Sequence, residues 1–320
     1  MSPATMDTMR AVRRCEQRVQ VSDVPRPTGE GVLVDIVASG ICGSDLHLLS
    51  SPFAPSVTLG HEISGKLRDG TPVAIEPMAP CGSCEHCIAG HTNHCQLGPA
   101  MSMGVGLDGG MAEQIRVPER AIVPLPSGLP LADACLIEPL AVAYHGIRLS
   151  GTGEGARVAV IGGGSIGQCA VAVAASLGAQ VTLLARHDGQ RQAGERLGAK
   201  LTAEADYDLV IDAAGSASAL QQAVKLARPS AMLLLLATYW EGLELPGFEL
   251  CMKEIRVIPA SMYSQHGAVR DIDRATSILA ANPTIAEAMI THRFPLDAAP
   301  EAFATAADRA SGAIKVVLEP

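Results

Sequence analysis

Aromatic side chains are scarce in this chain of 320 residues: they make up 3% of it, against 48% for all hydrophobic residues. We therefore expect cores built mainly from aliphatic and alanine side chains. Basic residues are also few, because 24 lysines and arginines stand against 33 acidic residues and leave a net charge of −9. This balance argues against nucleic acid or an anionic membrane as the main partner.

Uninterrupted apolar runs are missing as well. Residues 1–14 are polar and contain no segment like the apolar core of a secretory signal peptide. The longest uncharged apolar stretch, residues 158–185, is interrupted by glycines and polar residues, which favours a buried βαβ unit over a membrane span. Nine cysteines without an export signal indicate reduced thiols or metal ligands, so we expect a cytoplasmic protein.

A strand, a glycine turn, a helix and a second strand follow one another in the middle of the chain. Apolar runs at 158–161 and 181–184 fit buried parallel strands, and residues 165–177 carry small and apolar side chains at helical spacing. The turn has the spacing of the dinucleotide-binding fingerprint, Gly162-x-Gly164-x-x-Gly167. A purely structural glycine turn is the alternative, and the flanking elements favour the dinucleotide site.

Each glycine of this turn has a physical role. Gly162 permits the tight turn, Gly164 lets a pyrophosphate approach the backbone, and Gly167 lets the helix pack close to the strand. The free N–H groups at the start of the helix, at Ser165 and Ile166, then face the phosphates.

The residues after the second strand bear on which dinucleotide binds. An NAD site usually carries an acidic residue there, bonded to the ribose 2′-hydroxyl. This chain has Ala185 followed by Arg186, and Arg191 further on, so two guanidiniums are available for a 2′-phosphate. The nearest acid, Asp188, lies a few residues late. We predict NADP(H) over NAD(H); in the alternative, both arginines are solvated residues at a helix start.

The rest of the chain predicts a β-rich first domain and a doubly wound α/β second domain. We expect residues 1–30 to be irregular. The other expected strands are 31–38, 63–67, 72–75, 208–213, 231–237, 254–259 and 314–318, and the other expected helices are 219–227 and 268–281.

Four cysteines are grouped at the spacing C-x2-C-x2-C-x7-C. Four thiolates this close indicate a tetrahedral structural zinc site, with an iron–sulfur cluster or redox thiols as the alternatives. Three histidines in the same segment are expected to be solvated, because four cysteines already complete the coordination shell. The cysteines are Cys81, Cys84, Cys87 and Cys95, and the histidines are His86, His91 and His94.

A second set of metal-binding side chains lies elsewhere in the sequence. Cys42, His61 and Glu62 are residue types that bind zinc, although a cysteine and a distant histidine alone mean little. Glu138 stands in an apolar segment, where an unpaired carboxylate is costly and a nearby cation would explain it. Zinc with Cys, His and carboxylate ligands and one exchangeable position is a catalytic arrangement.

These motifs together resemble the zinc-dependent medium-chain alcohol dehydrogenase family, in the family's order and over nearly the whole chain. The segment around Glu138 looks most like the polyol (sorbitol) and threonine dehydrogenase branch, in which a Glu occupies the place of a zinc-binding Cys. The motifs are GICGSDLH at 40–47, GHE at 60–62, the four-cysteine lobe, GGMAE at 109–113, EPL at 138–140 and GGGSIG at 162–167.

The resemblance implies a GroES-like, β-rich catalytic domain at residues 1–148 and a Rossmann nucleotide-binding domain at 149–284. It also implies that residues 285–320 return to the first domain. Cys42 and His61 would ligate a catalytic zinc, and Glu62 and Glu138 would be carboxylates at the metal, directly or through water. Ser44 would pass the alcohol proton outward, with His47 nearer solvent; a turn residue is the alternative for Ser44. We interpret His145 as a structural core histidine.

Three features depart from the family pattern. The stretches 62–73 and 198–210 are short for the family, and both are interpreted as trimmed surface loops. The acidic residue that goes with the family's common preference for NAD is missing, because Ala185 stands in its place.

The sequence thus predicts an oxidoreductase with two zincs per chain that transfers a hydride between NADP(H) and a secondary alcohol or polyol, or the corresponding ketone. A homodimer or homotetramer is expected, with no nucleic-acid or membrane partner. One alternative is an NADPH-dependent biosynthetic reductase of an activated C=C or C=N bond, against which the intact zinc ligand set argues. The other is a non-catalytic NADPH-binding redox sensor, which would not need Cys42, His61 and Glu138.

Overall fold

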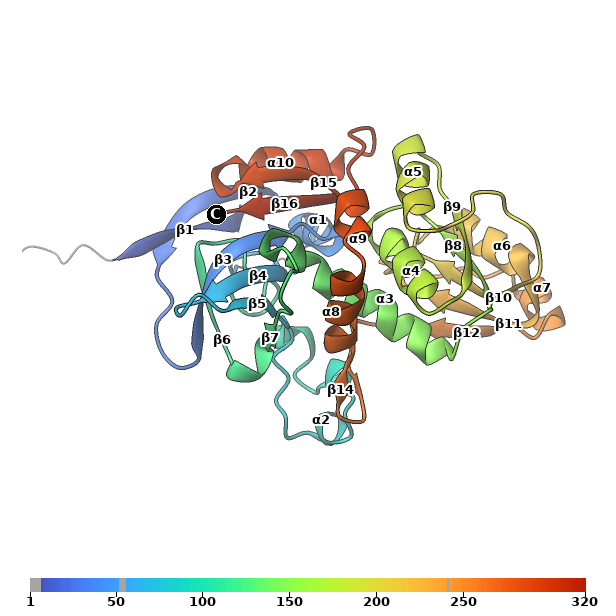
Figure 1. Ribbon diagram of the computed structural model, residues 1–320, viewed down its shortest axis with the longest axis horizontal. Coiled ribbons are helices and arrows are strands. Elements are labelled where there is room, and N and C mark those ends of the chain that lie inside the picture. The colour runs from blue at the N-terminus through green and yellow to red at the C-terminus, as the bar shows by residue number, and fades with distance from the viewer. Residues whose placement is uncertain (1–6, 52–55, 241) are drawn as a thin grey trace, which may run out of the picture. The chain divides into compact units, whose positions relative to one another are not determined.

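The computed structural model describes residues 7–51, 56–240 and 242–320, which fall into two compact units (Figure 1). The first unit comprises the described residues up to Glu138 together with Ile290–Pro320, and the second comprises Pro139–Met289. The boundary falls near the start of one helix, α3 (Ile137–Ser150). No helix within the described ranges is long and apolar enough to span a bilayer.

The first unit is built on a seven-stranded sheet in the order β15-β16-β3-β4-β5-β7, with β6 also paired to β3. Strands β3, β4 and β5 run antiparallel, whereas the C-terminal strands β15 and β16 are parallel to each other. Apolar side chains of β3, β4, β5 and β6 form one core, whereas those of β16 pack in two other clusters. The strands are β3 (Val32–Gly40), β4 (Glu62–Leu67), β5 (Pro72–Ile75), β6 (Gln114–Val117), β7 (Ile122–Pro124), β15 (Ile290–Pro295) and β16 (Lys315–Glu319).

The expectation of an irregular start is wrong for residues 8–25, whereas residues 26–30 form no helix or strand. Strands β1 (Thr8–Cys15) and β2 (Arg18–Pro25) form an antiparallel hairpin, with Glu16 at φ 56° in its turn. The hairpin buries one set of apolar residues, and its partly exposed Arg10 pairs with Glu113 and Asp297. The many arginines hid the strand pattern, because each ion pair involves a residue far away in the sequence.

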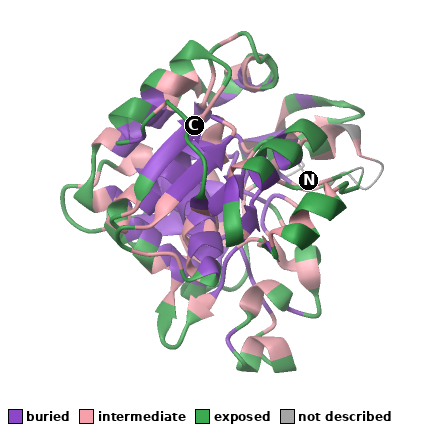
Figure 2. Ribbon diagram, turned by 90° about the vertical axis from the view of Figure 1, so that its right-hand side faces the viewer, coloured by how far each residue is buried: buried purple, intermediate pink, exposed green. Residues whose placement is uncertain are grey.

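The second unit is a parallel five-stranded sheet in the order β12-β11-β10-β8-β9. Ala159 and Ile161 of β8 pack with α6, so the alternate residues Val158 and Val160 face the opposite side, where α4 contacts β8. Helices thus cover both faces, which confirms the predicted doubly wound sheet. Figure 2 shows buried residues along the strands and exposed ones on outer helix faces.

The elements of the second unit differ in places from the sequence-based expectations. The strand expected at 231–237 begins earlier and ends earlier, at Ala227 and Leu235, and the helix expected from residue 268 begins at Asp271. After α3, the second unit consists of β8 (Arg157–Ile161), α4 (Ser165–Ser176), β9 (Gln180–Leu184), α5 (Asp188–Arg196), β10 (Tyr207–Asp212), α6 (Ala217–Leu226), β11 (Ala227–Leu235), α7 (Gly247–Met252), β12 (Arg256–Pro259), β13 (Gln265–His266), β14 (Val269–Arg270), α8 (Asp271–Ala281) and α9 (Thr284–Met289). The helices of the first unit are α1 (Gly43–Ser50), α2 (Glu85–Ile88) and α10 (Ala299–Ala307), and 3-10 turns complete the chain.

Candidate metal centres and dinucleotide site

The sheet register of the first unit brings three candidate zinc ligands together. Cys42 precedes helix α1, His61 immediately precedes β4, and Glu62 is the first residue of β4; their ligand atoms are within 4.8 Å of one another. Gly40 pairs with Glu62 across β3 and β4, and a Cβ on Gly40 would lie 2.0 Å from a carboxylate oxygen of Glu62. Only glycine therefore leaves room for Glu62 at this position.

Asp45, which sequence reasoning missed as a site residue, lies beside His61. Its Oδ2 accepts a hydrogen bond from the Cys42 backbone N–H at 2.9 Å, and its Oδ1 is 3.6 Å from Nδ1 of His61. Burial raises the pKa of Asp45. Burial alone would lower the pKa of His61, but the negative charge of Asp45 helps to raise it well above its usual value. A carboxylate that faces one ring nitrogen orients a histidine so that its other nitrogen can bind a metal.

Ser44 and His47 lie one helical turn apart on α1. The hydroxyl of Ser44 is 3.3 Å from Nε2 of His61, and His47 is exposed to solvent.

The sequence does contain a signal for Asp45. It stands three residues after Cys42, where its carboxylate closes a capping box with the Cys42 N–H.

Lys315 is a second residue of this site that sequence reasoning missed. Its Nζ donates to both carboxylate oxygens of Glu62, at 2.5 and 2.6 Å, and to the carbonyl oxygen of Ile41 at 3.1 Å. Lys315 is only 1% exposed although it stands in the apolar strand β16. A lysine in an apolar strand was the available signal, since a buried charge needs a partner.

Glu138 occupies the first turn of α3 and is also buried. Burial raises the pKa of Glu138 to about 7, against the opposing influence of His61. Among the described residues, Glu138 does not belong to the group whose ligand atoms lie within 4.8 Å of one another. The structure thus brings Cys42, His61 and Glu62 together and places Glu138 in their electrostatic neighbourhood.

The four cysteines of the lobe also converge, with all four sulfur atoms within 4.8 Å of one another. The backbone N–H of Cys84 lies 3.3 Å from the sulfur of Cys81, and the N–H of Cys81 lies 3.4 Å from the sulfur of Cys95. The backbone N–H of Ser83 and that of Cys84 help to lower the pKa of Cys81 to about 6, whereas burial raises that of Cys87 to about 12. This donor set fits a tetrahedral zinc ion.

The cysteines are free thiols, and the three histidines of the lobe differ in their exposure to solvent. All nine cysteines fall within the described residues and none forms a disulfide. His91 and His94 are exposed and His86 is half-buried, and the ring of His94 lies 6.2 Å from that of His86 and 6.0 Å from that of His91.

The glycine turn of the second unit leaves room for a phosphate. Gly162 has φ 107°, which favours glycine, and a Cβ on Gly167 would lie 1.9 Å from the carbonyl oxygen of Gly162. Gly164 faces open space, because a Cβ there would meet no atom within 4 Å. The Ser165 hydroxyl, at the start of α4, is buried without a hydrogen-bond partner in the described part of the chain. These backbone and hydroxyl groups fit a dinucleotide pyrophosphate.

The two arginines after β9 are placed differently from each other. Arg191 forms an ion pair with Asp188 and donates to the carbonyl oxygen of Arg186 at 3.3 Å. Arg186 is exposed, and within the described ranges no ion pair neutralises it. His145 is buried in the second unit and bonds Asp271 at 2.8 Å, which fits a structural role.

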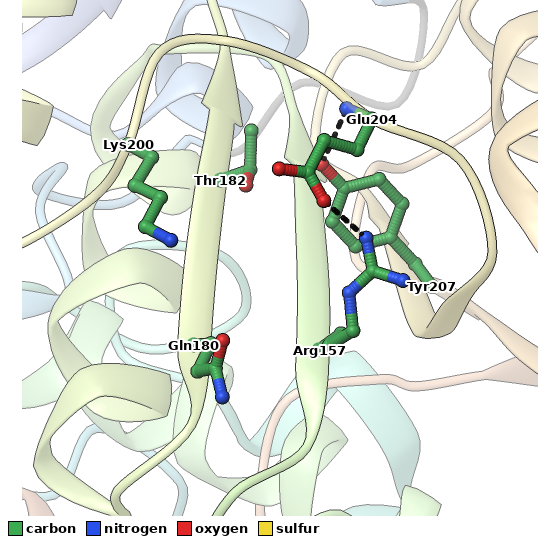
Figure 3. Close-up of a pocket in the computed structure, with 6 residues that line it drawn as sticks. All are labelled: Arg157, Gln180, Thr182, Lys200, Glu204 and Tyr207. Atoms are coloured by element: carbon green, nitrogen blue, oxygen red, sulfur yellow. Dashed lines mark hydrogen bonds and ion pairs between the residues drawn. The ribbon is translucent and has the colours of Figure 1, made fainter.

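A small polar hollow lies at the opposite, amino-terminal edge of this sheet. Figure 3 shows Arg157 pointing to Glu204, with Tyr207 beside them, and Gln180, Thr182 and Lys200 on the other side. Arg157 and Glu204 form an ion pair at 2.6 Å. Since the glycine turn follows the carboxyl end of β8, this hollow is separate from the candidate dinucleotide site.

Comparisons with known proteins agree with this architecture. The family model "Alcohol dehydrogenase GroES-like domain" matches residues 28–127, and "Zinc-binding dehydrogenase" matches residues 165–277. L-galactonate-5-dehydrogenase of Escherichia coli K12 is 31% identical over 303 residues, which cover 85% of this chain and 87% of that protein.

Solved structures extend the match to almost the full length. A protein of Sinorhizobium meliloti 1021, proposed to be a zinc-binding dehydrogenase and crystallised with NADP, is 31% identical, with a TM-score of 0.86 and coverage of 98% and 100%. Galactitol-1-phosphate dehydrogenase of Escherichia coli is 29% identical, with a TM-score of 0.86 and the same coverage.

The fold and the side chains together define a two-part enzyme with a GroES-like domain and a Rossmann domain, as predicted. The chain belongs to the zinc-dependent medium-chain alcohol dehydrogenase family, and it is an oxidoreductase.

Proposed function

We propose that this enzyme transfers a hydride between NADP(H) and a secondary alcohol or polyol, or the corresponding ketone, with a catalytic zinc at Cys42, His61 and Glu62. The convergence of these three ligand atoms within 4.8 Å carries the proposal. A cysteine, a histidine and a carboxylate with one open position form a donor set that suits a catalytic zinc.

Each residue of the set has a separate part. Cys42 and His61 would hold the metal, with Asp45 fixing the ring of His61. Glu62 would be the third ligand, and Lys315 balances its charge. Glu138, outside that group, would act on the metal through a water molecule.

The reaction needs a path for one proton. When bound, zinc acts as a Lewis acid that lowers the pKa of an alcohol, and the nicotinamide exchanges the hydride. Ser44, 3.3 Å from Nε2 of His61, would accept the alcohol proton, and the exposed His47 would pass it to solvent.

The choice of NADP(H) rests on the second unit. Ala185 brings no negative charge to the end of β9, and Arg186 is exposed and free of an acidic partner among the described residues. Because the guanidinium of Arg191 is already paired with Asp188, Arg186 would be the main 2′-phosphate contact. The NADP-bound relative supports the same choice.

The proposal extends to the remaining zinc, the substrate class and the assembly. The four-cysteine lobe would hold a structural zinc, which gives two zincs per chain. The relatives act, by name, on L-galactonate and galactitol 1-phosphate, which supports a polyol-like secondary alcohol as substrate. A homodimer or homotetramer follows from the family resemblance alone, and light scattering tests it.

A panel of alcohols and ketones tests the activity, with NADP(H) and NAD(H) compared by the absorbance of the reduced nicotinamide. We expect a higher kcat/KM with NADP(H). Cys42→Ser should abolish turnover, whereas Cys15→Ser, at an exposed thiol outside both metal sites, should not. Full activity in the Cys42→Ser enzyme would refute the zinc mechanism, and a clear preference for NAD(H) would refute the cofactor assignment.

A further inference from the structure

A buried glutamine connects the glycine turn to the helix that follows the second strand. Gln168 lies in the second turn of α4 and is 0% exposed. Its Nε2 donates to the carbonyl oxygen of Gly163 at 3.0 Å and to that of Gln190 at 2.8 Å. Gly163 belongs to the glycine turn and Gln190 to the first turn of α5, so one side-chain amide holds two separate segments.

The chemistry of the two partners fixes the direction of this amide. Both partners are carbonyl oxygens, which only accept hydrogen bonds, so the amide nitrogen must face them. Oε1 of Gln168 is buried and has no hydrogen-bond partner within the described ranges. Leaving a buried acceptor unsatisfied costs free energy, so the gain must come from the two bonds made by the nitrogen.

The same two segments are also in close contact. A Cβ on Gly163 would lie 2.6 Å from the Cβ of Ala185 and 2.7 Å from the Cβ of Gln190. Gly194 of α5 also packs closely, since a Cβ there would lie 2.3 Å from Cδ2 of Leu183 in β9. The start of α5 therefore lies at a fixed distance from the glycine turn, set by close packing and by the Gln168 amide.

This distance matters for a dinucleotide with a 2′-phosphate. The pyrophosphate would lie at the glycine turn, and Arg186 and Arg191 flank the start of α5. The covalent structure of the cofactor fixes the separation of its phosphates, so the protein must hold its two phosphate-binding segments at a matching separation. We propose that Gln168 is a positioning residue for the 2′-phosphate, because it ties the α5 start to the glycine turn. This inference rests on the proposed use of NADP(H).

Gln168→Met tests the proposal, because it keeps the length of the side chain and removes the donor. We expect the Kd for 2′,5′-ADP, measured by calorimetry, to rise about tenfold, the effect of losing roughly one net hydrogen bond. The Kd for 5′-AMP, which lacks the 2′-phosphate, should change much less. In turnover, KM for NADP(H) should rise while kcat stays nearly unchanged.

A control must separate positioning from a general loss of stability. Val173→Ala creates a cavity in the same helix, at a buried residue that does not bond the glycine turn. It should lower the melting temperature without changing the ratio of the two dissociation constants. A Gln168→Met enzyme with the wild-type ratio, or a Val173→Ala enzyme with the same change in ratio, would overturn the positioning role.

Measurements on the wild-type enzyme distinguish a failure of the positioning role of Gln168 from a failure of the NADP(H) assignment. If it binds 2′,5′-ADP no more tightly than 5′-AMP, the NADP(H) assignment itself is wrong and the positioning role is lost with it. If it prefers 2′,5′-ADP and only the Gln168→Met result is negative, the cofactor assignment stands and the role of Gln168 alone is refuted.

Discussion

Lys315 and Glu62 form an ion pair inside the first unit, with Nζ at 2.5 and 2.6 Å from the two carboxylate oxygens and each side chain 1% exposed. Breaking such a pair leaves the other charge buried and alone. We expect Lys315→Met to lower the free energy of unfolding by about 3–5 kcal/mol. Urea unfolding monitored by circular dichroism measures this loss.

Two further variants test the interpretation of that result. Lys66→Met removes an exposed lysine from strand β4 and should have little effect. The double variant Lys315→Met with Glu62→Gln removes both charges and should recover part of the lost stability. A double variant no more stable than Lys315→Met alone would show that the pair is not the cause.

The glycine turn gives a prediction in which two alanine substitutions fail in different ways. Gly167→Ala should destabilise the fold, because its Cβ would lie 1.9 Å from the Gly162 carbonyl oxygen. Gly164→Ala should fold normally, because its Cβ would meet nothing within 4 Å, and should lose dinucleotide affinity. Melting temperature and the Kd for the cofactor, measured on both proteins, distinguish the two effects. Unchanged cofactor affinity in Gly164→Ala would place the pyrophosphate elsewhere.

Arg186 is predicted to set the cofactor preference. Arg186→Ala should lower kcat/KM for NADP(H) by about tenfold or more, since a charge-assisted contact to phosphate is lost, and should leave NAD(H) turnover nearly unchanged. Arg196→Ala, at the end of helix α5, removes an exposed arginine that pairs with Glu287 and serves as the control. Equal losses with both cofactors would show that Arg186 does not contact a 2′-phosphate.

Local spacing was enough to predict the four-cysteine group and the glycine turn, whereas the grouping of Cys42, His61 and Glu62 was predicted from the family resemblance. The four lobe cysteines are separated by a few residues, so their convergence required only a tight loop. The sequence could not show which residue Lys315 pairs with, because Glu62 is 253 residues away and is reached only through the pairing of β16 with β3 and of β3 with β4. Asp45 was missed for a different reason: a carboxylate in the first turn of a helix usually marks a cap.

The strands were also predicted where a local pattern marks them and missed where the pattern depends on residues far away in the sequence. The parallel strands of the second unit are buried on both faces and therefore read as apolar runs in the sequence. The hairpin of β1 and β2 was missed because two of its arginines, Arg10 and Arg13, pair with distant acids such as Asp297. The observed β11 begins four residues before the predicted strand, because residues 228–230 are exposed and contain no apolar run.

The two metal groups should lose their zinc separately. We expect two zincs per chain in the wild-type protein, measured by elemental analysis. Cys42→Ser should remove one zinc and the activity but leave the lobe folded. Cys84→Ser should remove the other and lower the melting temperature, because a lobe of this size depends on its metal. A wild-type protein with a single zinc that Cys84→Ser abolishes would leave the Cys42 group without metal.

Asp271 gives a prediction for the dependence of stability on pH. Its carboxylate accepts hydrogen bonds from Arg148 at 2.8 and 2.9 Å and from the Ser264 N–H at 3.0 Å, and it bonds His145 at 2.8 Å. Burial alone would raise the pKa of Asp271, but these hydrogen bonds outweigh it and lower the pKa. The folded protein therefore favours the ionised carboxylate more strongly than the unfolded chain does.

The sign of the pH effect follows from that lowered pKa. The stabilisation is complete above the unfolded pKa of about 3.9 and is lost as the pH falls through the lower folded pKa. Asp271→Asn should therefore cost about 3 kcal/mol at neutral pH, and the difference from wild type should narrow in acid. Asp273→Asn, whose partly exposed carboxylate pairs with Arg270 immediately before helix α8, should cost about 1 kcal/mol or less. Urea unfolding of the three proteins at neutral and acid pH measures both effects, and a difference between wild type and Asp271→Asn that stays constant in acid would contradict the assigned ionisation.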